Sequence, residues 1–143
     1  MLKRNKRGFT LIEVMIVVAI VSILVGIAYP SYVEHIQRSR RSECTTVMVS
    51  VANMLERRYS TTAPATYVAA PPIPAALTAC PSQGGGGVYY NIAPTVLTAT
   101  TFTIQATPTI SQAGDKCGSL TLTHAGVKGV IGAKPGVTAE QCW

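Results

Sequence analysis

The chain is poor in the residues from which catalytic sites are built. Its 143 residues include two histidines, His35 and His124, and a single aspartate, Asp115. Charged residues make up 13% of the sequence, against roughly 25% in an average soluble domain. A catalytic triad or a pair of catalytic carboxylates needs acids and a histidine that this sequence does not place in related contexts. We therefore expect no enzyme activity, no cofactor and no small-molecule substrate.

Phosphate-loop and metal motifs are also missing. The glycine run 84–87 is not followed by the Lys and Ser or Thr of a phosphate-binding loop. The four cysteines contain no Cys-x-x-Cys pair, and neither histidine lies near a cysteine pair. Asp115 and Glu140 are a poor ligand set for calcium, so we expect no metal site. An even number of cysteines in a small chain favours disulfides and an oxidising compartment.

The positive net charge of +6 comes mainly from the first seven residues. Lys3, Arg4, Lys6 and Arg7 supply four of the twelve basic side chains. Without residues 1–8 the balance is 8 basic minus 6 acidic, or +2. The basic pI is thus mostly a property of this segment, and it assigns no residue to nucleic-acid binding.

An apolar run of 20 residues, 9–28, follows the basic segment. As a helix it would span about 30 Å, the thickness of the hydrocarbon core of a bilayer. The basic segment before it predicts a cytoplasmic N-terminus, with everything after Pro30 on the outside. Glu13 interrupts the run, and a carboxylate inside a membrane span is costly and marks a functional site.

Two explanations of Glu13 remain open at this point. Its side chain can reach the membrane surface from a position close to the cytoplasmic end. Alternatively it pairs with a free α-amino group at Phe9, if the chain is cut after Gly8. The segment also has a different interpretation, as an ordinary secretory signal with a cleavage site at 26–28, which would release a soluble binding domain that starts at Tyr29. That alternative leaves Glu13 unexplained.

The segment Gly8-Phe9-Thr10-Leu11-Ile12-Glu13, after a basic leader and before an apolar helix, resembles the type IV prepilin motif. The resemblance implies that a prepilin peptidase removes residues 1–8 by cutting after Gly8, and that Phe9 is then N-methylated. It also implies that Glu13 pairs with the N-terminal amine of a neighbouring subunit during assembly.

The same resemblance implies the partners and the location. The chain would polymerise with other pilin subunits, drawn from the membrane by an inner-membrane assembly platform. Before assembly it would be a single-pass protein of the bacterial inner membrane, and afterwards part of an extracellular filament. Such filaments serve adhesion, twitching motility or DNA uptake, and the sequence does not choose among these roles.

A second helical stretch, 30–60, continues the apolar segment 9–29. Pro30 predicts a kink between them. Apolar side chains then recur at steps near three and four, which indicates an amphipathic helix with one buried face. This stripe consists of Val33, Ile36, Cys44, Val47, Val51, Met54 or Leu55, and Tyr59. The arginines of this stretch, at 38, 40, 41, 57 and 58, are expected on its solvated face.

Residues 61–143 predict a globular head. Residues 61–87 are rich in Ala, Pro, Thr and Gly and predict a loop without regular structure. Alternating segments at 88–92, 101–107 and 119–123, with a short edge strand at 127–131, predict an antiparallel sheet with one buried side. Packing of this sheet, within about 88–131, on the helix stripe gives an α+β fold.

The four cysteines allow three pairings. Proximity in sequence favours Cys44–Cys80 and Cys117–Cys142, the second of which would close a C-terminal loop over 117–142. Trp143 either packs on the head or stands exposed.

The layout of long helix, loop, sheet and disulfide-closed loop is similar to type IVa pilins. The run 113–122 and the Cys-Trp ending resemble PilE-type minor pilins. A minor pilin is therefore our first interpretation. A major pilin and a type II secretion pseudopilin are the alternatives.

Overall fold

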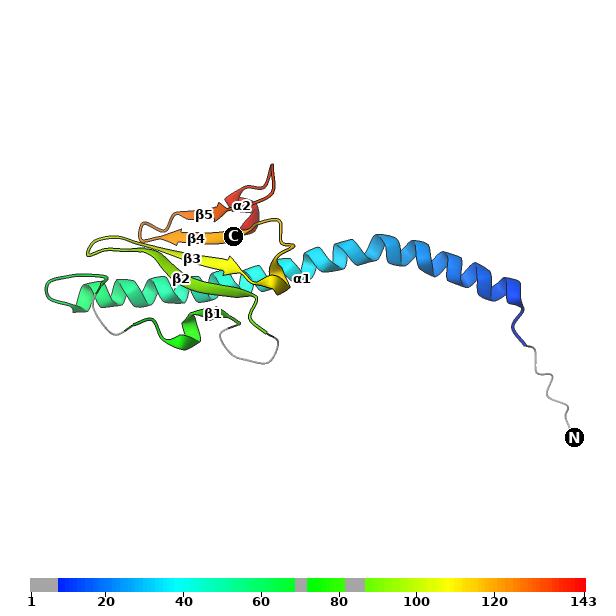
Figure 1. Ribbon diagram of the computed structural model, residues 1–143, viewed down its shortest axis with the longest axis horizontal. Helices are drawn as coiled ribbons and strands as arrows, with labels where there is room; N and C mark the ends of the chain where they lie inside the picture. Colours follow the sequence, from blue (N-terminus) through cyan, green and yellow to red (C-terminus); the bar gives the residue numbers. More distant parts are fainter. Residues whose placement is uncertain (1–7, 69–71, 82–86) are drawn as a thin grey trace, which may run out of the picture. The chain divides into compact units, whose positions relative to one another are not determined.

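The computed structural model describes residues 8–68, 72–81 and 87–143, and it divides into two compact units, one up to His35 and one from Ile36 to Trp143. One long helix, α1 (Leu11–Thr61), belongs to both units (Figure 1). Its bounds lie within two residues of the expected helix, which confirms that prediction. Pro30 lies inside α1, and the kink expected there stays a prediction. Residues 1–7 of the expected leader lie outside the described residues.

The first unit is the N-terminal part of α1. Its large apolar side chains between Leu11 and Tyr32 are all exposed. By length and composition α1 can cross a membrane. A helix that is apolar all round needs lipid or other helices as its surroundings.

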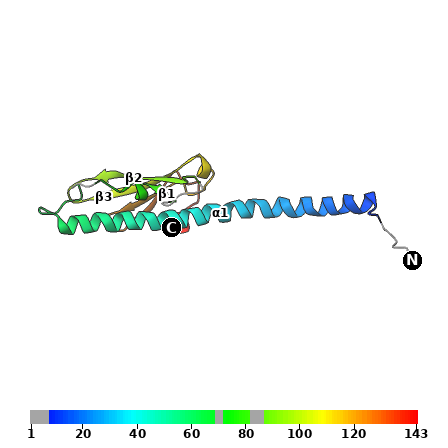
Figure 2. The same ribbon diagram turned by 90° about the horizontal axis from the view of Figure 1, so that it is seen from below.

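The second unit contains the rest of α1 and one five-stranded sheet. The strands are β1 (Ala79–Cys80), β2 (Tyr90–Leu97), β3 (Phe102–Pro108), β4 (Ser119–Thr123) and β5 (Lys128–Ile131). They are antiparallel and lie side by side in chain order. Figure 2 shows the sheet lying along the C-terminal part of α1. The expected α+β architecture is confirmed.

The core lies between the sheet and α1. On β3 and β4 every second side chain is buried, as the alternation predicted. These strands contribute five side chains to the core: Phe102, Ile104, Ala106, Leu120 and Leu122. From α1 it takes Cys44, Val47, Met48, Val51 and Leu55, so most of the predicted stripe is confirmed.

Two expectations were wrong. The segment 61–87 contains the short strand β1 and the 3₁₀ turn η1 (Ala75–Leu77), while its residues 69–71 and 82–86 lie outside the described residues. A two-residue strand cannot show alternation, so its pairing with β2 was not visible in the sequence. Strand β2 is also longer than expected. It continues through Pro94, which lies at a register shift opposite β3 and therefore leaves the pairing on either side intact.

Two further short elements complete the unit. The 3₁₀ turn η2 (Ile110–Gln112) lies between β3 and β4, and the helix α2 (Ala139–Cys142) lies near the C-terminus. A capping box starts α2: the side chains of Thr138 and Gln141 each bond to the backbone of the other. His124 lies in the turn after β4.

Candidate functional site

The start of α1 brings the residues of the N-terminal motif together. Phe9 is 84% exposed and precedes the helix. The backbone N–H of Glu13 donates to Thr10 Oγ1 at 3.3 Å, and the backbone N–H of Thr10 lies 3.5 Å from Glu13 Oε2. This reciprocal pattern is a capping box. This role of Thr10 was not predicted, although its Thr-x-x-Glu spacing is the usual signal.

The cap leaves the Glu13 carboxylate free to accept further hydrogen bonds. A carboxylate has two oxygens and can accept several hydrogen bonds, and here one oxygen faces a single backbone donor. The helix dipole also favours a negative charge in this first turn. Glu13 can therefore hold its place on the helix and accept a bond from a cation at the same time.

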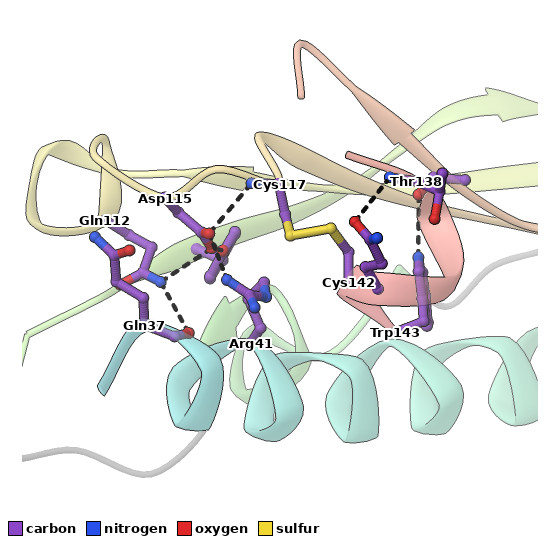
Figure 3. Close-up of a disulfide and its surroundings, with 11 residues drawn as sticks. Gln37, Arg41, Gln112, Asp115, Cys117, Thr138, Cys142 and Trp143 are labelled. Atoms are coloured by element: carbon purple, nitrogen blue, oxygen red, sulfur yellow. Dashed lines mark hydrogen bonds and ion pairs between the residues drawn. A yellow bond between two sulfur atoms is a disulfide. The ribbon is translucent and has the colours of Figure 1, made fainter. Parts of the chain in front are cut away.

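A buried polar cluster joins α1 to the sheet in the second unit (Figure 3). Arg41 is 3% exposed and forms an ion pair with Asp115. The other carboxylate oxygen of Asp115 accepts bonds from the Tyr90 hydroxyl at 2.6 Å and from Gln112 Nε2 at 3.2 Å. The backbone N–H of Cys117 completes the set at 3.2 Å. Arg41 was expected on the solvated face. It lies inside because Asp115 supplies a buried counter-charge that is 74 residues away in sequence.

The cluster changes the acidity of Tyr90. Burial raises the pKa of its hydroxyl above the ordinary value of 10.0, and the hydrogen bond to Asp115 raises it further. Both effects disfavour the phenolate, because it would be a second negative charge in a dry site. The cluster is thus suited to fastening the fold, since every acceptor of Asp115 is occupied by a protein donor.

Two disulfides hold the same unit together. Cys44 pairs with Cys80, and Cys117 pairs with Cys142, with Cα–Cα distances of 5.3 and 5.8 Å. These are the two pairings that sequence proximity favoured. The first fastens β1 to α1, and the second closes the C-terminal loop beside the polar cluster (Figure 3).

Trp143 packs on the head, which decides between the two expectations for it. Its indole Nε1–H donates to the carbonyl of Gly129 at 3.0 Å, and its ring is half-buried. The ammonium of Lys128 lies 5.3 Å from the centre of the ring.

The remaining basic side chains are spread over the second unit. Arg40 lies over the ring of Tyr89 at 4.0 Å and donates to the carbonyl of Ser111 at 3.1 Å. Arg38 and Arg57 are exposed, as expected. Among the described residues no group of three His, Cys, Asp or Glu side chains could hold a metal ion.

Comparison with protein families assigns both parts of the chain. Residues 3–29 match the prokaryotic N-terminal methylation motif, and residues 30–121 match the model of the type IV minor pilin ComP, DNA uptake sequence receptor. The chain belongs to this family of type IV minor pilins. The methylation motif supports a prepilin segment in place of an ordinary secretory signal, and the family matched by residues 30–121 is a structural pilin family.

Relatives of this minor pilin are similar over a short stretch. The fimbrial protein EcpC of Eikenella corrodens is 56% identical over 43 residues, which cover 30% of this chain and 28% of EcpC. The type IV major pilin protein PilA of Myxococcus xanthus is 58% identical over 42 residues, 29% of this chain and 19% of PilA. The matched stretch thus spans less than a third of these relatives.

A solved structure extends the likeness to the fold. The non-core minor pilin PilV of Neisseria meningitidis superposes with a TM-score of 0.53 over 74% of this chain and 95% of PilV, at 21% identity. The type IV pilin fold is therefore shared. As a member of this family, the chain is a structural subunit of a type IV pilus. Its apolar helix has the length and composition to cross a membrane, which together with the methylation motif fits a membrane-anchored pilin that becomes part of an extracellular filament.

Proposed function

We propose that this minor pilin binds DNA and serves DNA uptake by the pilus. The observation that carries the proposal is the match of residues 30–121, well over half of the chain, to a family described as a DNA uptake sequence receptor. The matches to major pilins extend over only 42 residues, so they favour neither a major nor a minor role.

The charges of the head support this proposal. After Thr61 the sequence has three basic residues, Lys116, Lys128 and Lys134, and two acids, Asp115 and Glu140. Asp115 is buried and neutralised by Arg41, so it contributes no negative charge to the surface. The backbone N–H of Lys134 donates to the carbonyl of Lys116 at 2.8 Å, which brings these two lysines to adjacent segments. Cations on such a surface contact DNA phosphates independently of sequence.

The processing and assembly steps are part of the same proposal. A peptidase cuts after Gly8, Phe9 becomes the methylated N-terminus, and Glu13 pairs with the amine of a neighbouring subunit. Before assembly the N-terminus faces the cytoplasm across the inner membrane, from which an assembly platform draws the subunit. The capping geometry of Glu13 supports this, since it leaves acceptor capacity for the amine.

Deletion of the gene tests the DNA role against a role in filament assembly. We expect a deletion strain to keep its filaments and to take up far less fluorescently labelled duplex DNA, with uptake restored by the wild-type gene. Normal uptake without the chain would contradict the proposal, as would loss of the filaments together with uptake.

Binding by the purified chain tests the phosphate contacts. We expect full-length protein in detergent to bind labelled duplex DNA with an affinity that falls as salt rises. The triple substitution Lys116→Gln, Lys128→Gln and Lys134→Gln should reduce the slope of log affinity against log salt by up to about 3, roughly one for each lost contact. The single substitution Arg38→Gln, on the exposed face of α1, is the control for a charge outside the head.

A further inference from the structure

A hollow of about 280 Å³ lies between α1 and the C-terminal end of the second unit. Its lining combines an aromatic ring, an amine, hydroxyls and one apolar side chain. The residues are Thr45, Thr46, Val49, Ser50, Lys128 and Trp143. Its volume lies just below the range of about 300–1,000 Å³ typical of ligand pockets, so it suits a single ring or base.

The ring of Trp143 is held in place before any ligand arrives. Its indole N–H is bonded to Gly129, and its backbone N–H is bonded to the carbonyl of Ala139 at 3.1 Å. The residue before it, Cys142, is fixed by a disulfide to Cys117. An aromatic ring fixed in this way loses little conformational entropy when a ligand stacks on it.

Polar groups of complementary kinds surround this ring. Lys128 is exposed, lies beside the ring and forms no ion pair with a carboxylate among the residues described here. The hydroxyls of Thr45, Thr46 and Ser50 donate to helix carbonyls at 2.9, 3.1 and 3.0 Å. Because their protons are used in this way, they present lone pairs to the hollow. The hollow thus offers a cation for a phosphate and acceptors for the N–H groups of a base.

A second hollow of about 280 Å³ adjoins the first along α1. It is lined by Ser50, which both hollows share, and by Asn53, Met54 and Arg57. Arg57 is exposed and lies two helical turns after Ser50, a rise of about 10 Å. No acidic residue lines either hollow within the described ranges 8–68, 72–81 and 87–143.

From this arrangement we infer that the two adjoining hollows, here called the Trp143 groove, bind single-stranded DNA. One unpaired base stacks on Trp143, while Lys128 and Arg57 contact phosphates on either side. A cationic groove that carries an aromatic platform is the usual design for single strands. A paired base in a duplex has both faces covered by its neighbours, so it cannot use Trp143 in this way. This inference rests on the proposed DNA function and adds the form of DNA and the residues that hold it.

The test uses full-length protein in detergent and two probes, a fluorescein-labelled 12-nucleotide oligo-dT and a labelled 12-base-pair duplex of mixed sequence. Trp143 is the only tryptophan in the chain, so its emission reports directly on the groove. We expect oligo-dT to quench this emission. Trp143→Leu should weaken oligo-dT binding by about 5- to 150-fold, the range that loss of one stacked base produces. Trp143→Tyr, which keeps a stacking ring, should restore most of the affinity.

Arg57→Gln sharpens the test without touching the aromatic ring. It should lower the salt slope of oligo-dT binding by about 0.7, the value for one contact to a single strand. Arg38→Gln removes the same charge from α1 outside the groove and should leave oligo-dT binding unchanged.

The outcomes separate the inference from the proposed function. If duplex DNA binds while oligo-dT neither quenches Trp143 nor responds to Trp143→Leu, the Trp143 groove is wrong and the DNA function stands. If neither probe binds, the proposed function fails and the groove fails with it. Quenching together with weakened binding of Trp143→Leu and rescue by Trp143→Tyr supports both.

Discussion

The two parts of α1 show how one helix can serve two purposes. Residues 11–32 carry apolar side chains all round, and all of the large ones are exposed. Residues 36–61 carry one apolar stripe, and Cys44, Val51 and Leu55 on it are completely buried. The backbone hydrogen bonds are of the same kind in both parts, so the difference lies in the side chains alone. A helix with one apolar stripe can pack that stripe against the rest of its own chain. A helix that is apolar all round also needs lipid or the helices of other chains around it.

This difference separates two kinds of defect. Substitutions in the first part should impair processing or assembly and leave the stability of the head unchanged. Substitutions under the sheet should lower the free energy of unfolding of the head. They should reduce incorporation into filaments only because the head is less stable. The following predictions test this division, in order of decreasing effect.

The largest effect is expected from Gly8→Val. A side chain at Gly8 meets no atom within 4 Å, so the substitution does not disturb the fold. It should block leader removal completely, so that the intact mass retains residues 1–8 and the chain is absent from filaments. Gly26→Ala is the matched control, because a Cβ there also meets nothing within 4 Å. A wild-type mass that starts at Tyr29 would show that the prepilin interpretation is wrong.

Glu13→Gln should reduce incorporation into filaments by about 10- to 100-fold, since a hydrogen bond to a charged group contributes about 1.5–3 kcal/mol. Glutamine can still form the capping box with Thr10, so α1 itself should start normally. Immunoblots of sheared filaments and of membranes measure the ratio. Equal incorporation of the variant and the wild type would favour the explanation in which Glu13 only reaches the membrane surface.

In the second unit, Asp115→Asn should lower the free energy of unfolding by about 3–5 kcal/mol, because Arg41 would keep a buried charge without its counter-charge. Thermal unfolding followed by circular dichroism measures this loss. Arg38→Gln, an exposed change on α1, should stay within about 0.5 kcal/mol of the wild type. A loss below 1 kcal/mol for Asp115→Asn would mean that water reaches Arg41.

The smallest effect concerns pH. The folded pKa of Tyr90 is raised above 10.0, so the unfolded chain releases this proton first as pH rises. Its contribution to stability is therefore complete below pH 10 and declines above it, by up to about 1.4 kcal/mol per pH unit. Unfolding in urea between pH 9 and 11 should show a shallower decline for Tyr90→Phe than for the wild type. Tyr32→Phe, at an exposed position in the first unit, should leave the slope unchanged.

Much of the fold could be predicted because its signals are local. The apolar run, the helix stripe and the alternation of β3 and β4 each show in a window of a few residues. The interior place of Arg41 could not be predicted, since it depends on Asp115 and Tyr90 from distant segments. Strand β1 has two residues and exists through its pairing with β2.

The N-terminal motif was the most predictable of the candidate sites, since its glycine, aromatic residue and misplaced acid lie within six residues. The Trp143 groove was the least predictable. Its lining comes from α1, β5 and the C-terminal residue, and the sequence left open whether Trp143 packs at all.

By itself, therefore, the sequence determined the helix, the sheet and the prepilin motif, because backbone propensity, hydrophobic period and a linear motif all act between near neighbours in the chain. Only the tertiary structure decided which charges are neutralised inside, which remain on the surface, and where an aromatic ring meets an amine. These outcomes depend on distance and burial, which set the strength of every electrostatic contact.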